Sequence, residues 1–247
     1  MASILRRAIA VARSRISTAR ERATHPVPVG SVDFGDLRRT EPISRVFGLD
    51  RGTPVDRHYI EAFLAENSSA VRGRVLEIGD ATYTRQFGGS AVVQSDVLHV
   101  TGDAPEATII ADLTDAPHIA TDTFDCVILT QTLQFTYSME SIVAELFRIL
   151  TPGGSVLCTV PGISQISGYD MDRWGDYWRL TALSARELFE TAFPAEQLDV
   201  RTYGNVLAAT AFLHGLAVRE LSGAELDVHD DDYPLIVAIK ATKPAAA

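Results

Sequence analysis

Acidic residues and one glycine stand where short apolar runs end, and this pattern could bind a nucleoside. Residues 75–83 read VLEIGDATY, so an acid and Gly79 close the first run. Glycine lets a ligand approach the backbone without an intervening side chain. Asp96 is predicted to end the second run, where a carboxylate can accept hydrogen bonds from both ribose hydroxyls. Asp112 is predicted to end the third run, beside Leu113, where an adenine can lie.

Buried parallel strands must position these residues. Five short apolar runs bounded by turns are predicted to be strands buried on both faces of a sheet. They lie at residues 75–78, 91–93, 108–111, 124–129 and 155–160. Further strands are predicted at residues 199–203 and 235–241, and helices at residues 56–66, 139–150, 185–192 and 206–221. Strands that alternate with helices indicate a doubly wound α/β sheet.

Several helix ends carry their own signals. Ser138 is the predicted N-cap of the helix that begins at Met139, and the Thr-Pro-Gly-Gly of residues 151–154 ends that helix. Ser184 and Glu187 have the spacing of a capping box, which predicts the start of the next helix. Gly215 is a candidate break in the last one.

Residues 55–242 resemble the class I S-adenosylmethionine-dependent methyltransferases. In that family an acid and a glycine-rich turn end the first strand, and further acids end the second and third. Residues 148–154, RILTPGG, are the most specific match, because Leu-x-Pro-Gly-Gly before an apolar strand is a strong marker of the family. The chain departs from the family's three glycines, since Ala81 and Tyr83 stand where the second and third usually lie.

This resemblance implies a Rossmann-like, doubly wound, seven-stranded sheet, mostly parallel with the last strand antiparallel, after an N-terminal helical extension. It implies S-adenosylmethionine as cofactor and a small-molecule, sugar or natural-product acceptor, methylated on oxygen. The methyltransferase domain is expected at residues 54–247, and a basic helix with a linker or cap at residues 1–53. The residues expected to hold the cofactor are Tyr59, Glu77, Gly79, Asp80, Ala81, Tyr83, Asp96, Asp112, Leu113, Thr130 and Gln131.

A narrower resemblance involves three segments, residues 51–61, 131–135 and 174–181. They look like a bacterial type 11-like subgroup whose members are often found near glycosyltransferase and natural-product genes. That context implies tailoring of a glycan or secondary metabolite, by analogy.

An aromatic and charged segment at residues 164–180 follows the fifth predicted strand and contains both tryptophans of the chain. Such an insertion can roof a ligand pocket. Alternatively, Trp174 and Trp178, four residues apart, form one buried helix face. The residues expected to contact the acceptor are Tyr169, Trp174, Tyr177, Trp178 and Arg179.

A general base is useful for an alcohol acceptor and unnecessary for a carboxylate. The candidates are His58, Asp170 and His214, although the sequence favours a packing or surface position for either histidine. The spacing of the histidines is not typical of a metal site, and no metal is expected.

The net charge of -10 argues against general affinity for nucleic acid, which needs a basic face. Residues 1–22 nevertheless predict a basic amphipathic helix that packs on its own domain, docks on a partner or lies on a membrane surface. With no long apolar run or secretory signal, a cytoplasmic location is expected.

Three other functions stay open. A peptide or protein carboxyl methyltransferase would need a broad open groove in place of a roofed pocket. A non-catalytic Rossmann-like binding module would keep the fold without turnover. A nicotinamide enzyme is disfavoured, because a pyrophosphate needs the full glycine set. The oligomeric state is not indicated by the sequence.

Overall fold

The computed structural model describes residues 27–246, so the basic helix predicted over residues 1–22 lies outside the described part of the chain. The chain divides into two compact units, Met1–Thr40 and Glu41–Ala247. The described part of the first unit contains a short 3-10 helix, η1 (Gly35–Leu37). No helix between residues 27 and 246 is both long and apolar enough to cross a membrane.

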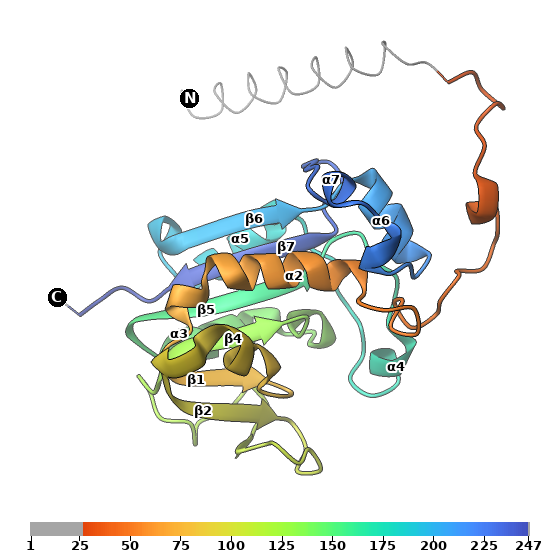
Figure 1. Ribbon diagram of the computed structural model, residues 1–247. Coiled ribbons are helices and arrows are strands. Elements are labelled where there is room, and N and C mark those ends of the chain that lie inside the picture. Colours follow the sequence, from red (N-terminus) through yellow and green to blue (C-terminus); the bar gives the residue numbers. More distant parts are fainter. Residues whose placement is uncertain (1–26, 247) are drawn as a thin grey trace, which may run out of the picture. The chain divides into compact units, whose positions relative to one another are not determined.

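A seven-stranded sheet forms the centre of the second unit, with the order β3-β2-β1-β4-β5-β7-β6 (Figure 1). The strands are β1 (Gly73–Ile78), β2 (Val92–His99), β3 (Ile109–Ile110), β4 (Phe124–Thr130), β5 (Leu150–Pro161), β6 (Leu198–Tyr203) and β7 (Ile236–Thr242). β7 pairs antiparallel with β5 and β6, and the other pairs are parallel. The predicted Rossmann-like sheet with an antiparallel last strand is therefore confirmed.

Helices cover both faces of this sheet (Figure 1). One face packs against α2 (Val55–Glu66), α6 (Val206–Leu213) and α7 (Gly223–Leu226). The other face packs against α3 (Met139–Ile149) and α5 (Ala182–Glu190). Neighbouring residues on a strand serve opposite faces: Val75 belongs to the first core and Leu76 to the second. This is why the central strands read as continuous apolar runs.

Short elements connect these helices and strands. They are η2 (Ser68–Ala70), the π-helical turn η3 (Thr84–Gly88), η4 (Gly89–Ala91), η5 (Leu133–Phe135), α4 (Gly168–Met171), η6 (Ala195–Gln197) and η7 (Val218–Glu220). Only the two turns η3 and η4 join β1 to β2, so the crossover behind the first strand is compact.

Two predicted strand ends are wrong. The second strand continues to His99, and Asp96 lies inside it, paired with Leu76 of β1. The third strand ends at Ile110, two residues before Asp112. Polar residues at these positions interrupt the apolar runs in the sequence, but the backbone pairing runs past Asp96 and stops short of Asp112.

Two predicted helix boundaries are also wrong. The helix expected from residue 185 begins at Ala182, because Thr181 is its N-cap and Ser184 is the third residue of the resulting capping box. The helix expected over residues 206–221 ends at Leu213, and Gly215 follows with a φ of 69°. That left-handed conformation favours glycine and accounts for the break.

Residues 41–53, here called the strap, pack beside the end of α6. The backbone N–H groups of Ile43 and Ser44 both donate to the carbonyl of His214, at 2.9 and 3.0 Å. A Cβ at Gly215 would lie 2.4 Å from the Ser44 carbonyl oxygen, so no larger residue fits. This close approach holds the strap against the same edge of the unit as the start of α2.

Candidate functional site

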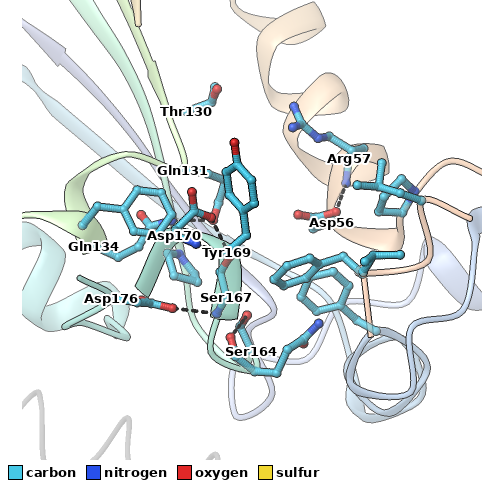
Figure 2. A pocket seen from close by; sticks show the side chains of 18 of the residues that line it. Asp56, Arg57, Thr130, Gln131, Gln134, Ser164, Ser167, Tyr169, Asp170 and Asp176 are labelled. Atoms are coloured by element: carbon cyan, nitrogen blue, oxygen red, sulfur yellow. Dashed lines mark hydrogen bonds between the residues drawn. The ribbon is translucent and has the colours of Figure 1, made fainter. Parts of the chain in front are cut away.

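A cavity of about 970 Å³ lies at the carboxyl ends of β1, β4 and β5. Its walls come from the turn after β1, the loop after β4, the strap with the start of α2, and residues 162–179, here called the α4 segment. In doubly wound folds this edge of the sheet is where ligands bind. Figure 2 shows Asp56 and Arg57 on α2 across the cavity from Tyr169 and Asp170.

The turn after β1 is held open by Glu77. Its buried carboxylate accepts hydrogen bonds from the backbone N–H groups of Tyr83 (3.0 Å) and Thr84 (2.7 Å). Burial raises the pKa of Glu77, while these hydrogen bonds oppose the rise. Gly79 has a φ of 92°, and a Cβ there would meet nothing within 4 Å. The turn therefore leaves free space for a ligand against its backbone.

The departures from the glycine pattern are accommodated by packing. Ala81 is buried, and Tyr83 packs beside Phe87 with its ring centroid 6.0 Å away. The Tyr83 hydroxyl accepts a hydrogen bond of 2.5 Å from Arg57, which links the turn to α2. A large residue at position 83 thus braces the turn, and its ring is 4% exposed.

The loop after β4 brings amide side chains to the cavity. Gln131 has a φ of 49°, rare for a residue with a side chain, and its backbone N–H donates to the Thr159 carbonyl at 2.8 Å. Gln134 is 5% exposed and donates a long, weak hydrogen bond of 3.4 Å to Gln131. Its Oε1 is buried without a hydrogen-bond partner among the described residues. Strain and an unsatisfied acceptor in one loop are typical of a functional site.

The first two turns of α2 supply two acids and one cation, Asp56, Glu61 and Arg57. Burial raises the pKa of Asp56 to about 6, and the attraction of Arg57 offsets this only in part. Sequence reasoning missed Asp56 as a site residue. The available signal was an acid two residues after Pro54, at the start of an amphipathic helix, within the segment that carried the narrower resemblance.

The α4 segment is fixed by a buried ion pair. Arg179 donates to both carboxylate oxygens of Asp176, at 2.6 and 2.8 Å, and to the carbonyls of Ser164 and Gln165. Desolvation acts to raise the pKa of Asp176, but the hydrogen bonds from Arg179 and Ser167 outweigh it and lower that pKa. The segment is mostly irregular with one short helix, which favours the predicted roof over a buried helix face that carries both tryptophans.

Eight of the predicted site residues line the cavity. They are Glu77, Asp80, Tyr83, Thr130, Gln131, Tyr169, Asp170 and Arg179. Gly79 and Ala81 belong to the turn after β1 but do not themselves line the cavity. Trp174, Tyr177 and Trp178 also do not line it. The Trp174 ring lies edge-on to His99 at 6.1 Å, and Trp178 donates to the Thr136 carbonyl.

Two of the predicted cofactor-binding acids, Asp96 and Asp112, do not line the cavity. The Asp96 carboxylate accepts hydrogen bonds from Arg74 (2.8 Å), Gln94 and Thr108, on the face of the sheet and away from the cavity. Asp112 caps its own turn by accepting from Thr114, and Leu113 beside it is buried in the core. The residue that stands at the carboxyl end of β2 is His99.

Other predicted site residues also lie elsewhere. Tyr59 is buried in the core, its hydroxyl donates to the Leu226 carbonyl at 3.0 Å, and burial raises its pKa to about 12. His58 packs against Tyr59, with ring centroids 5.1 Å apart. His214 follows the end of α6 and contacts the strap through its carbonyl. None of these three lines the cavity, so neither histidine is placed to act as a base.

Comparison with known proteins agrees with this fold. Residues 82–158 match a family described as a methyltransferase domain. No curated protein matches the chain. Within residues 27–246, no group of three or more acidic, histidine or cysteine side chains is arranged to hold a metal ion.

Two solved structures share the fold at low identity. A SAM-dependent methyltransferase from Archaeoglobus fulgidus is 11% identical, with 76% of this chain and 94% of that chain covered and a TM-score of 0.51. An N-methyltransferase from Haemonchus contortus, solved with phosphomonomethylethanolamine and S-adenosylhomocysteine, is 17% identical, with 89% and 62% covered and a TM-score of 0.52.

The cavity fits the cofactor of such enzymes. Gly79 leaves space against the backbone, and the lining carries six carboxylates against three guanidinium groups, which suits a cationic sulfonium. No phosphate-binding glycine set is required, because S-adenosylmethionine has no phosphate. The segment that matches the methyltransferase domain, residues 82–158, lies within a Rossmann-like sheet of the same fold as these solved methyltransferases.

Proposed function

We propose that the chain is an S-adenosylmethionine-dependent methyltransferase that acts on a small molecule bound between the strap and the α4 segment, and that the methylated atom is one that gives up a proton. The observation that carries the proposal is the cavity itself. At about 970 Å³ it has the size expected for a cofactor with a small acceptor.

The cofactor is assigned to the β1 and β4 side of the cavity. Gly79 gives access to the backbone, and Asp80, Thr130 and Gln131 supply polar groups to its amino-acid end. The ribose is assigned to the carboxyl end of β2, in place of Asp96; His99 stands at that end beside Trp174 of the α4 segment, next to the cavity and not in its lining. When bound, S-adenosylmethionine supplies a methyl group on a positively charged sulfur, a strong electrophile that needs no activation by the protein.

The acceptor is assigned to the α2 and α4 side. The chain's task is then to position the acceptor, exclude water and take up a proton. Asp56 is the proposed base, in place of His58 and His214. With a pKa of about 6 it is mostly ionised at neutral pH, yet it binds a proton more readily than an ordinary carboxylate. Tyr169, Asp170 and Arg179 form the opposing wall.

Calorimetric titration with S-adenosylmethionine, S-adenosylhomocysteine and NAD, each alone, tests the cofactor side. Micromolar binding of the first two without NAD is the expected result. Binding of NAD alone would overturn the assignment. Binding of the cofactor without turnover on any small molecule or peptide would favour the non-catalytic module, and turnover on peptide carboxylates would favour the protein methyltransferase.

A further inference from the structure

We propose that the acceptor binds as a protonated amine and is methylated on nitrogen. This inference rests on the proposed function, because it concerns the acceptor side of the same cavity. The oxygen target expected from the sequence is thereby replaced by an amine. The argument comes from the charges and hydrogen-bond acceptors that line the α2 and α4 walls and the adjoining loop after β4, where the Gln134 carbonyl accepts from the backbone N–H of Tyr177 in the α4 segment.

The first observation is a set of carboxylates that form no ion pair within the described residues. Asp56 and Glu61 on α2 and Asp170 on the α4 segment all line the cavity. Between residues 27 and 246, no side-chain nitrogen of Lys, Arg or His lies within 4.0 Å of these three carboxylates. Carboxylates grouped around a cavity repel each other, and a bound cation relieves this repulsion.

The second observation is that the cations of the cavity are engaged elsewhere. Arg179 is neutralised by its bidentate pair with Asp176. Arg45 pairs with Glu41 at 3.7 Å. Arg57 donates to the Tyr83 hydroxyl and, with Asp56 and Glu61 nearby, offsets part of their charge. An anionic or carboxylate acceptor would therefore meet excess negative charge on these walls, whereas an ammonium group would be attracted.

The third observation concerns hydrogen bonds. The side-chain oxygens Oε1 of Gln134 and Gln165 both belong to residues lining the cavity, and both are buried without a partner within the described chain. A buried acceptor left unpaired costs free energy, so a ligand that donates hydrogen bonds there is favoured. An ammonium group offers three N–H donors and no acceptor, which matches a wall of acceptors.

The two walls then have different tasks. Asp170, whose carboxylate is held by Ser167 at 2.5 Å, anchors the charged amine before reaction. The Asp56 carboxylate takes the proton that the amine must lose to become nucleophilic. The nitrogen lone pair forms the new bond to the methyl carbon, the carbon–sulfur electron pair stays on sulfur, and S-adenosylhomocysteine and the methylated amine leave. Charge and atoms balance without any further reactant.

Binding of matched probes to the protein saturated with S-adenosylhomocysteine tests this inference. One set is tyramine, tyrosol and para-hydroxyphenylacetate, and another is glucosamine, glucose and glucuronate. In each set the charge changes from cationic to neutral to anionic. In the first set the change is at the end of the same side chain, and in the second the amine is on C2 of the sugar and the carboxylate on C6. We expect the amine of at least one set to bind about tenfold or more tighter than its partners, as charge-assisted hydrogen bonds would give.

The matched variants are Asp170→Asn and Asp172→Asn. Asp172 lies on the same segment, is exposed and does not line the cavity. The Asp170 variant should lose most of the preference for the amine, and the Asp172 variant should keep it. Equal binding within every set, tighter binding of an alcohol or carboxylate, or no binding of any probe would overturn the amine assignment. Failure of S-adenosylhomocysteine to bind would instead contradict the proposed methyltransferase function, on which the amine assignment rests.

Discussion

Among the carboxylates on the acceptor side of the cavity, Asp56 combines burial with a position on a rigid helix. An ordinary aspartate has a pKa near 4 and is a weak base at neutral pH. Desolvation raises the pKa of Asp56 to about 6, so the group can accept a proton and still be ionised when the acceptor binds. The sequence does not show that the pKa of this aspartate is raised. The bases predicted from the sequence therefore included His58 and His214, because histidine ordinarily titrates near neutral pH.

The variant Asp56→Asn should lower kcat about a hundredfold or more, because a general base accelerates a reaction by a factor on the order of 10²–10⁴. The affinity for S-adenosylhomocysteine should hardly change. In the unaltered enzyme kcat should fall as the pH drops below about 6, because Asp56 becomes protonated. Steady-state rates from acid to neutral pH check this, with Glu66→Gln at the far, exposed end of α2 as control. An unchanged pH profile in the Asp56 variant would show that another group is the base.

The reassignment of the ribose gives a second residue-scale prediction. His99→Ala should weaken binding of S-adenosylhomocysteine by about 1–2 kcal/mol through a lost hydrogen bond. Asp96→Asn should leave that affinity unchanged and lower the free energy of unfolding by about 1–2 kcal/mol, because the pair with Arg74 is lost. Calorimetry and urea unfolding separate the two effects. Weaker binding in the Asp96 variant would restore the ribose role that the sequence predicted.

At the scale of elements, the packing of the strap against the end of α6 requires a glycine at position 215. A Cβ at Gly215 would collide with the Ser44 carbonyl, and its φ of 69° is unfavourable for other residues. Gly215→Ala should therefore lower the free energy of unfolding by about 2–3 kcal/mol and weaken acceptor binding, since the strap loses its support. Gly223→Ala is the matched control, because a Cβ there meets nothing within 4 Å and its φ is not left-handed. Equal unfolding free energies for both variants would show that the strap is not held by this contact.

Helices and strands were predictable from the sequence where the local pattern of apolar and polar residues determines them. The sheet, α2 and α3 follow from buried runs and helical periodicity, and they appear close to their expected bounds. The end of β2 was not predictable, because Asp96 looks like a strand end but is held inside the sheet by Arg74 and Thr108. Those partners come from distant positions, and such tertiary contacts override a local signal. The residues on the β1 and β4 walls of the cavity were predicted because they directly follow recognisable buried strands. The role of Asp56 on the α2 wall depends on its burial in the folded protein, and no sequence motif indicates that burial.

At the scale of the whole molecule, both cysteines of the chain report on unfolding. Cys126 and Cys158 are fully buried in the two central strands β4 and β5. Burial raises the pKa of Cys126 to about 12 and also raises that of Cys158, so neither thiol is reactive in the folded protein. Their alkylation therefore requires the sheet to open.

This makes iodoacetamide labelling a test of the cofactor site without any knowledge of the acceptor. Both cysteines should label slowly and together in the folded protein, and rapidly in urea. S-adenosylhomocysteine at a hundred times its Kd should slow labelling about a hundredfold, because it stabilises the folded state by about 2.7 kcal/mol. NAD at the same concentration should have no effect. Protection by NAD instead would contradict the cofactor assignment, and fast labelling of one cysteine in the absence of urea would show that its strand opens independently of the rest of the sheet.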